Sequence, residues 1–141
     1  MTDFVLDSQL QQDCFWVSDF PLCRLLMMND ARFRWFLLVP RVPGARDAID
    51  LSAYDYRRLW AESADLCRAM RIAFTPHKLN VAALGNQVAQ LHIHHIARYQ
   101  GDAAWPRPVW GQGAPEPMDD RVSRGYRKEL ESALPMRLRP R

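Results

Sequence analysis

The chain has 141 residues, of which 48% are hydrophobic and 25% are charged, and its formal net charge is +3. This length and composition predict one globular domain with its own core. We expect no membrane span, since no apolar run approaches the roughly 18 residues required, no secretory signal, and no binding to nucleic acid, because acidic residues are interspersed among the basic ones.

Two short apolar runs in the first third of the chain predict a β-hairpin. They cover residues 22–28 and 35–39, and the turn-forming sequence Asn29-Asp30-Ala31-Arg32 lies between them. A helix is expected over about 53–72, because Ser52 and Asp55 resemble a capping box and apolar residues then recur at helical spacing on one side. Such a helix covers one face of a sheet.

The second half of the chain predicts another hairpin and a terminal helix. Residues 79–84 form the first strand, the turn Gly85-Asn86-Gln87 follows, and it leads directly into a strand over 90–96. An ordered loop rich in proline and tryptophan precedes a helix at about 119–134, and the basic tail over 135–141 is expected to be disordered. These elements indicate a single α+β domain over residues 1–141.

The strand predicted over 90–96 contains three of the four histidines. Because side chains alternate between the faces of a strand, His92 and His94 point to one face, about 6.6 Å apart. His95 points to the other face, toward the core. Imidazole is nucleophilic near neutral pH, so one member of the pair can attack phosphorus while the other donates to phosphate oxygens or the leaving group. The spacing therefore suits chemistry on one phosphate.

The segment GNQVAQLHIHHIAR, residues 85–98, resembles the signature of the histidine triad (HIT) superfamily, in which a turn precedes alternating histidines and hydrophobic residues. Residues 25–30 and 36–41 are similar to the family's first two strands, and residues 102–111 resemble a bacterial branch. The matching core thus covers 22–111. The resemblance implies a HIT-like fold: an antiparallel sheet of about five strands with one long helix and a C-terminal helix.

The same resemblance implies a nucleotide hydrolase or nucleotidyl transferase acting at the α-phosphate of a dinucleoside polyphosphate or a nucleoside phosphoramidate. His92 corresponds to the nucleophile, which forms a covalent nucleotidyl-histidine that water hydrolyses. His94 corresponds to the residue that stabilises the phosphate charge or the leaving group. The scheme requires no metal and no other cofactor, and the family usually forms a homodimer. The candidate nucleotide- and phosphate-binding residues are Asn29, Asp30, Asn86, Gln87 and Gln90.

Two positions depart from the family pattern. Gln90 occupies the position of the first triad histidine, and Arg34-Trp35 stands where the family often has Gly-His before the second strand. In the family these two histidines lie near each other and support the nucleophile. Their absence predicts a different set of supporting residues. It also motivates a second hypothesis, a nucleotide-binding or regulatory protein with weak or no turnover.

Other readings of these residues remain open at the level of sequence. A His-x-His pair on a strand also suits zinc, so a zinc-dependent hydrolase is a weaker alternative. Asn29, Asp30, Asn86 and Gln87 are compatible with purely structural roles in turns, and Arg98 could pair with a carboxylate. The odd number of cysteines, with no metal-type spacing, favours the reducing cytoplasm.

Overall fold

A five-stranded antiparallel sheet forms the centre of the structure, a computed structural model that describes residues 3–140. The strands follow the spatial order β1-β2-β3-β5-β4. They are β1 (Cys14–Asp19), β2 (Cys23–Met28), β3 (Arg34–Pro40), β4 (Lys78–Ala83) and β5 (Ile93–Arg98). The α-helices are α1 (Ser8–Asp13), α2 (Ala53–Phe74) and α3 (Asp120–Ala133), and short 3-10 turns occur at Ala48–Asp50 and Met136–Leu138. This confirms the predicted α+β class.

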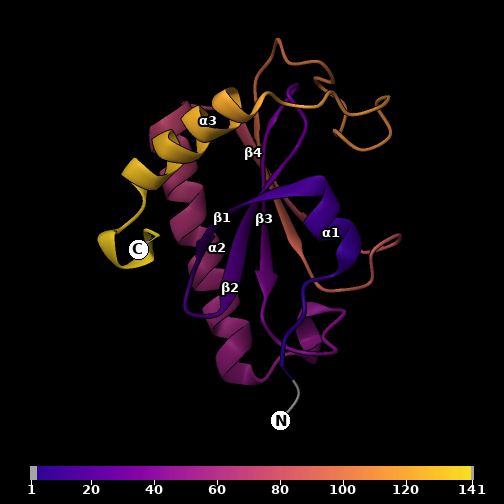
Figure 1. The fold of residues 1–141 in the computed structure, drawn as a ribbon, viewed down its shortest axis with the longest axis vertical. Coiled ribbons are helices and arrows are strands. Elements are labelled where there is room, and N and C mark those ends of the chain that lie inside the picture. The colour runs from indigo at the N-terminus through magenta and orange to yellow at the C-terminus, as the bar shows by residue number, and fades with distance from the viewer. Residues whose placement is uncertain (1–2, 141) are drawn as a thin grey trace.

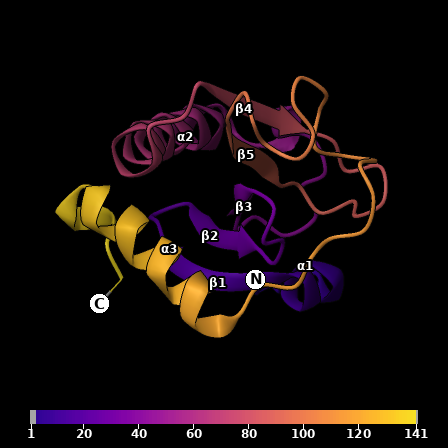
Figure 2. The ribbon, with the colours of Figure 1, turned by 90° about the horizontal axis from the view of Figure 1, so that it is seen from above.

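Both faces of the sheet are covered. Helices α2 and α3 lie side by side on one face, whereas α1 and the loop after β5 lie toward the other (Figures 1 and 2). Strand β3 therefore buries alternate residues in two cores, with Phe36 and Leu38 facing the long helices and Leu37 and Val39 facing the opposite side. This two-sided burial explains the continuous apolar run in its sequence.

The two predicted long helices are confirmed, with small changes at their ends. Helix α2 begins after Ser52, whose hydroxyl accepts a hydrogen bond from the amide of Asp55 at 3.1 Å, as the capping pattern indicated. It ends at Phe74, and the next residue, Thr75, adopts a left-handed conformation with φ of 42°. No helix in residues 3–140 is long and apolar enough to cross a membrane.

The predicted disorder of the tail is wrong for residues 135–140, while Arg141 lies outside the described residues. Leu138 is buried in the core beside α2 and α3, and the buried hydroxyl of Ser18 donates to its carbonyl at 2.8 Å. Arg137 also pairs with Asp65 of α2 at 2.9 Å. Leu138 was not recognised as a core residue because basic and apolar residues alternate in this segment, which is too short to show the period of a helix or a strand.

The histidine strand begins later than expected. Strand β5 starts at Ile93, which pairs with Ala83, so residues 84–92 form a loop instead of a tight turn. The amide of Leu91 donates to the carbonyl of Ala45 at 3.0 Å and therefore leaves the strand ladder. The sequence analysis also missed α1 and β1. Strand β1 is an edge strand, and an irregularity between Trp16 and Ser18 breaks the alternation of its side chains.

Arg98, at the end of β5, holds the following loop in place. Its guanidinium donates to both carboxylate oxygens of Asp102, at 2.8 and 3.1 Å, and to the carbonyl of Arg107 at 2.8 Å. Burial raises the pKa of Asp102, but the hydrogen bonds from Arg98 and from three backbone amides outweigh it and hold that pKa well below its usual range. This buried pair positions the loop that carries Val109 and Trp110.

We predict that Asp102→Asn lowers the free energy of unfolding by about 3–5 kcal/mol, because it leaves the guanidinium of Arg98 buried without its counter-charge. Asp120→Asn is the matched control. Asp120 pairs with Arg124 at the surface, where both side chains are about two-thirds exposed, and its loss should cost less than about 1 kcal/mol. Urea unfolding of both variants measures the difference, and equal effects would contradict the prediction.

Candidate active site

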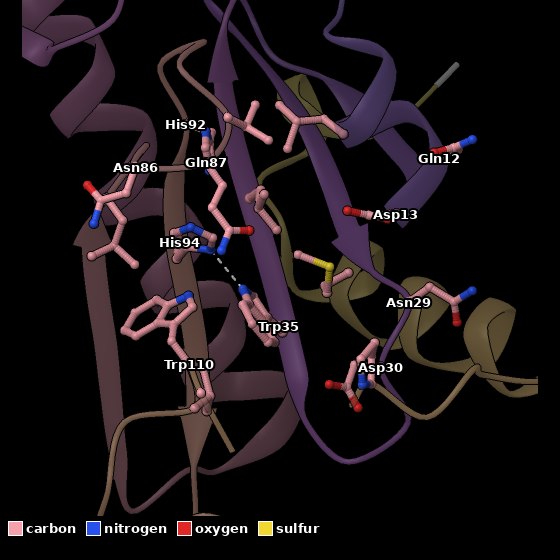
Figure 3. A pocket seen from close by; sticks show the side chains of 18 of the residues that line it. Gln12, Asp13, Asn29, Asp30, Trp35, Asn86, Gln87, His92, His94 and Trp110 are labelled. Carbon is pink, nitrogen blue, oxygen red and sulfur yellow. Dashed lines mark hydrogen bonds between the residues drawn. The ribbon is translucent and has the colours of Figure 1, made fainter. Parts of the chain in front are cut away.

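A cavity of about 700 Å³ opens on the sheet face opposite α2 and α3 (Figure 3). Its walls come from the end of α1, the hairpin of β2 and β3, the loop that precedes β5, and the segment that follows Val109. Leu10, Met28, Leu37 and Val88 supply an apolar surface. The volume and the mixed lining are typical of a small-molecule site.

The structure brings six of the seven predicted site residues to this cavity. They are Asn29, Asp30, Asn86, Gln87, His92 and His94. Gln90 has another position, since its side chain accepts a hydrogen bond from the amide of Asp7 at 2.8 Å and donates to the carbonyl of Val5 at 2.9 Å. Gln90 therefore anchors the N-terminal segment, and its placement gives no support to the predicted phosphate contact.

One hydrogen bond of His92 shows which of its ring nitrogens carries a hydrogen. Its Nδ1 lies 2.7 Å from the carbonyl oxygen of Gln90. Because a carbonyl only accepts, Nδ1 carries the hydrogen and donates it. In the neutral ring, Nε2 then holds an unshared electron pair. The ring is 6% exposed, so it reaches the cavity with little contact to bulk solvent.

His94 lies beside His92, with the ring centroids 4.8 Å apart. The indole N–H of Trp35 donates to Nδ1 of His94 at 2.9 Å, as the dashed line in Figure 3 shows. The ring is also flanked by Trp110, at 5.1 Å between centroids. Burial, together with a smaller effect of the neighbouring His92 and His95, lowers the pKa of His94 to about 3. His94 is thus neutral at physiological pH.

His95 faces the core on the opposite side of the sheet, as the alternation predicted. Its Nδ1 donates to the carbonyl of Ile93 at 3.0 Å, so its Nε2 accepts from the hydroxyl of Ser63 in α2 at 2.8 Å. The residue is fully buried, and this burial lowers its pKa to about 4. His95 therefore joins β5 to α2 and takes no part in the cavity.

Asn29 and Asp30 both line the cavity and fasten the segment that closes its lower side in Figure 3. The side-chain oxygen of Asn29 accepts from the amide of Met118 at 2.6 Å, and Asp30 accepts from the amide of Glu116 at 3.3 Å. Asp30 is also paired with Arg32 at 2.9 Å. Burial raises the pKa of Asp30, but the hydrogen bonds from Arg32 outweigh that effect and lower it.

Several cavity residues were missed by the sequence analysis. Gln12 and Asp13 lie at the end of α1, and Figure 3 shows the carboxylate of Asp13 across the cavity from the histidines. No signal pointed to them, because α1 itself was not predicted. Trp35 was noticed only as a departure from the family pattern, and Trp110 only as part of an ordered loop rich in proline and tryptophan.

Among residues 3–140, the structure shows no third ligand for a zinc ion bound by His92 and His94. Within residues 3–140, no group of three or more His, Cys, Asp or Glu side chains is arranged to hold a metal ion. In each of His92 and His94 the Nδ1 atom already has a partner, which leaves two Nε2 atoms facing the cavity.

Comparisons with known proteins found a matching family and similar solved structures. Residues 9–101 match the HIT domain family. A histidine triad protein from Bradyrhizobium japonicum is 41% identical, with a TM-score of 0.92, over 94% of this chain and 99% of that protein. A histidine triad protein from Marinobacter aquaeolei VT8 is 43% identical, with a TM-score of 0.91, over 94% of this chain and 97% of that protein. One from Sinorhizobium meliloti 1021 is 36% identical, with a TM-score of 0.91, over 93% of this chain and 97% of that protein. None of the curated proteins matches the chain.

Burial of His94 and His95 predicts that stability falls as the pH drops below about 6.5. In that range an unfolded histidine binds a proton, whereas these two stay neutral until about pH 3 and 4 in the folded protein. Each should contribute a loss of up to about 2 kcal/mol between pH 7.5 and pH 5. Unfolding free energies at the two pH values measure this loss.

His95→Gln serves as the control for this pH effect, because it removes one of the two titrating rings far from the cavity. The variant should show roughly half the wild-type loss between the two pH values, whatever its stability at pH 7.5. A wild-type stability that stays constant from pH 7.5 to pH 5 would contradict the assignment of neutral buried histidines.

Proposed function

The chain belongs to the HIT domain family, and we propose that it hydrolyses a nucleotide through transfer of the nucleotidyl group to His92. One observation supports this most directly. The hydrogen bond from Nδ1 of His92 to the carbonyl of Gln90 leaves the Nε2 electron pair directed to a cavity of suitable size. A positioned imidazole of this kind is an effective nucleophile near neutral pH.

In the first step, Nε2 of His92 attacks the α-phosphorus. The new N–P bond forms as the bond to the leaving group breaks, and the leaving group departs with the bonding electron pair. The imidazole ring acquires a positive charge, which the Nδ1–H contact to the Gln90 carbonyl stabilises. In the second step, water attacks phosphorus, the N–P bond breaks, and the neutral ring returns with release of a nucleoside monophosphate and a proton.

The other cavity residues have roles that follow from their positions. His94 donates toward the phosphate oxygens, and the loop residues Asn86 and Gln87 add amide donors. Asn29 and Asp30, on the far wall, are proposed to contact the ribose while they hold the segment at 116–118. The apolar wall accommodates the base. Suitable substrates are a dinucleoside polyphosphate or a nucleoside phosphoramidate.

The first triad position is the main reason to consider a second function. Gln90, which we infer to replace the first triad histidine, contacts the N-terminal segment and not the nucleophile. A protein that binds nucleotides without turning them over would be compatible with that arrangement. The free thiols of Cys14, Cys23 and Cys67 agree with a cytoplasmic protein in either case.

The decisive experiment uses diadenosine polyphosphate and adenosine phosphoramidate with the wild type, His92→Ala and His77→Ala. His77 is exposed and lies outside the cavity lining, so its variant is the matched control. We expect His92→Ala to reduce kcat by about 10⁴-fold or more and His77→Ala to retain wild-type activity. Mass spectrometry after quenching without acid should detect a nucleotidyl group on the peptide that contains His92.

Two results would decide against this proposal. Equal turnover by the wild type and His92→Ala would remove His92 from the mechanism. Tight binding with neither turnover nor adduct, for every nucleotide in a broad panel, would establish the non-catalytic binding protein instead.

We also propose that the protein forms a homodimer. Strand β4 lies at the edge of the sheet, where its unpaired backbone groups are able to pair with a second chain. Val81 of β4 is 41% exposed, and Tyr54 and Trp60 of α2 are exposed as well. Light scattering should show a dimer for the wild type and for Val122→Lys, on α3, but a monomer for Val81→Lys. A monomeric wild type would contradict the proposal.

A further inference from the structure

Trp35 and His94 form a side-chain pair across two neighbouring strands. Trp35, near the start of β3, is opposite Ile96 of β5, so His94 lies two residues along on the same face. The indole is 7% exposed and its N–H donates to Nδ1 of His94 at 2.9 Å. Both rings are held by packed strands, and this geometry is therefore a fixed property of the sheet.

The direction of this hydrogen bond decides where the proton of His94 lies. An indole nitrogen only donates, so Nδ1 of His94 must be the unprotonated acceptor, and the proton of the neutral ring is on Nε2. We propose that Trp35 is a positioning residue that fixes His94 as a neutral Nε2–H donor to a phosphate oxygen of the substrate. This inference rests on the proposed nucleotidyl transfer and assigns a role to Trp35 within it.

The surroundings of His94 favour the same state. Trp35 and Trp110 flank the ring at 5.6 and 5.1 Å between centroids, and His92 lies on a third side at 4.8 Å. Protonation of Nδ1 would set two N–H groups against each other at the indole contact. The charged side chains that line the cavity are Asp13, across from the histidines, and Asp30 and Arg32, which form an ion pair with each other.

A neutral Nε2–H stabilises negative charge without transferring its proton. The charge on the phosphate oxygens grows when Nε2 of His92 attacks, so a donor that is already oriented toward them lowers the barrier. If the hydrogen were on Nδ1 instead, Nε2 of His94 would present an electron pair to the phosphate and repel it. The tautomer of His94 thus determines whether this residue assists or opposes the reaction, and Trp35 determines the tautomer.

The first test is nuclear magnetic resonance of the free protein with ¹⁵N-labelled histidine. We expect the wild type to show His94 as the Nε2–H tautomer, with the Trp35 indole proton coupled to Nδ1 of His94. Trp35→Phe removes the donor and should convert His94 to a mixture of tautomers. Trp110→Phe is the matched control, because it removes an indole that packs on His94 without donating to Nδ1, and it should retain the wild-type tautomer.

The second test is single-turnover formation of the nucleotidyl-His92 adduct from adenosine phosphoramidate. We expect Trp35→Phe to slow adduct formation by about 10-fold or more while KM changes little, since the lost interaction belongs to the transition state. If the proposed function fails, the wild type forms no nucleotidyl-His92 adduct. The ¹⁵N spectra of the free protein still show which tautomer His94 adopts.

The inference is overturned if the wild-type spectrum shows His94 protonated on Nδ1 or charged, or if Trp35→Phe leaves both the tautomer and the rate of adduct formation unchanged. If Trp35→Phe does not fold, the wild-type spectrum alone decides, through the presence or absence of coupling between the Trp35 indole proton and Nδ1 of His94.

Discussion

Coverage of the sheet on both faces is the constraint on which the placement of the histidines depends. Strand β5 is buried throughout, with α2 on one side and the cavity on the other. A polar side chain in such a strand must find a partner on its own face, because burial without one is costly. His95 finds Ser63 in α2, and His94 finds Trp35 in β3. The three neighbouring imidazoles are thus separated into one that contacts α2 and two that line the cavity.

The partner at Nδ1 gives each imidazole a different capability. His92 and His95 donate from Nδ1 to backbone carbonyls, whereas His94 accepts at Nδ1 from an indole. The two cavity histidines consequently present opposite groups at Nε2, an electron pair on His92 and a proton on His94. A nucleophile beside a donor is what attack on a phosphate requires. In the proposed mechanism, two histidines therefore have different roles because their Nδ1 atoms have different partners.

Short-range periodicity predicted the two long helices and the faces of the histidines, whereas the five-stranded sheet was implied by the resemblance to the family. Alternation along residues 92–95 sufficed to separate His95 from the other two, and the Ser52 cap located the start of α2. It did not predict that Gln90 would leave the strand, because the partners of Gln90 are backbone groups of Val5 and Asp7, more than eighty residues away. The cavity wall at Asp13 was missed for the same reason, since contact across the fold leaves no local pattern.

Gln90 and Trp35, the two residues that we infer to depart from the family pattern, make contacts in different parts of the structure. The side chain of Gln90 contacts the N-terminal segment, whereas Trp35 contacts His94. Gln90 and Trp35 therefore do not together replace the contact that we infer between the two histidines of the family pattern. Trp35 contacts His94, the donor in the proposed mechanism, while the backbone carbonyl of Gln90 contacts His92, the proposed nucleophile, independently of the glutamine side chain. Because this contact comes from the backbone, the orientation of His92 does not require a histidine at position 90.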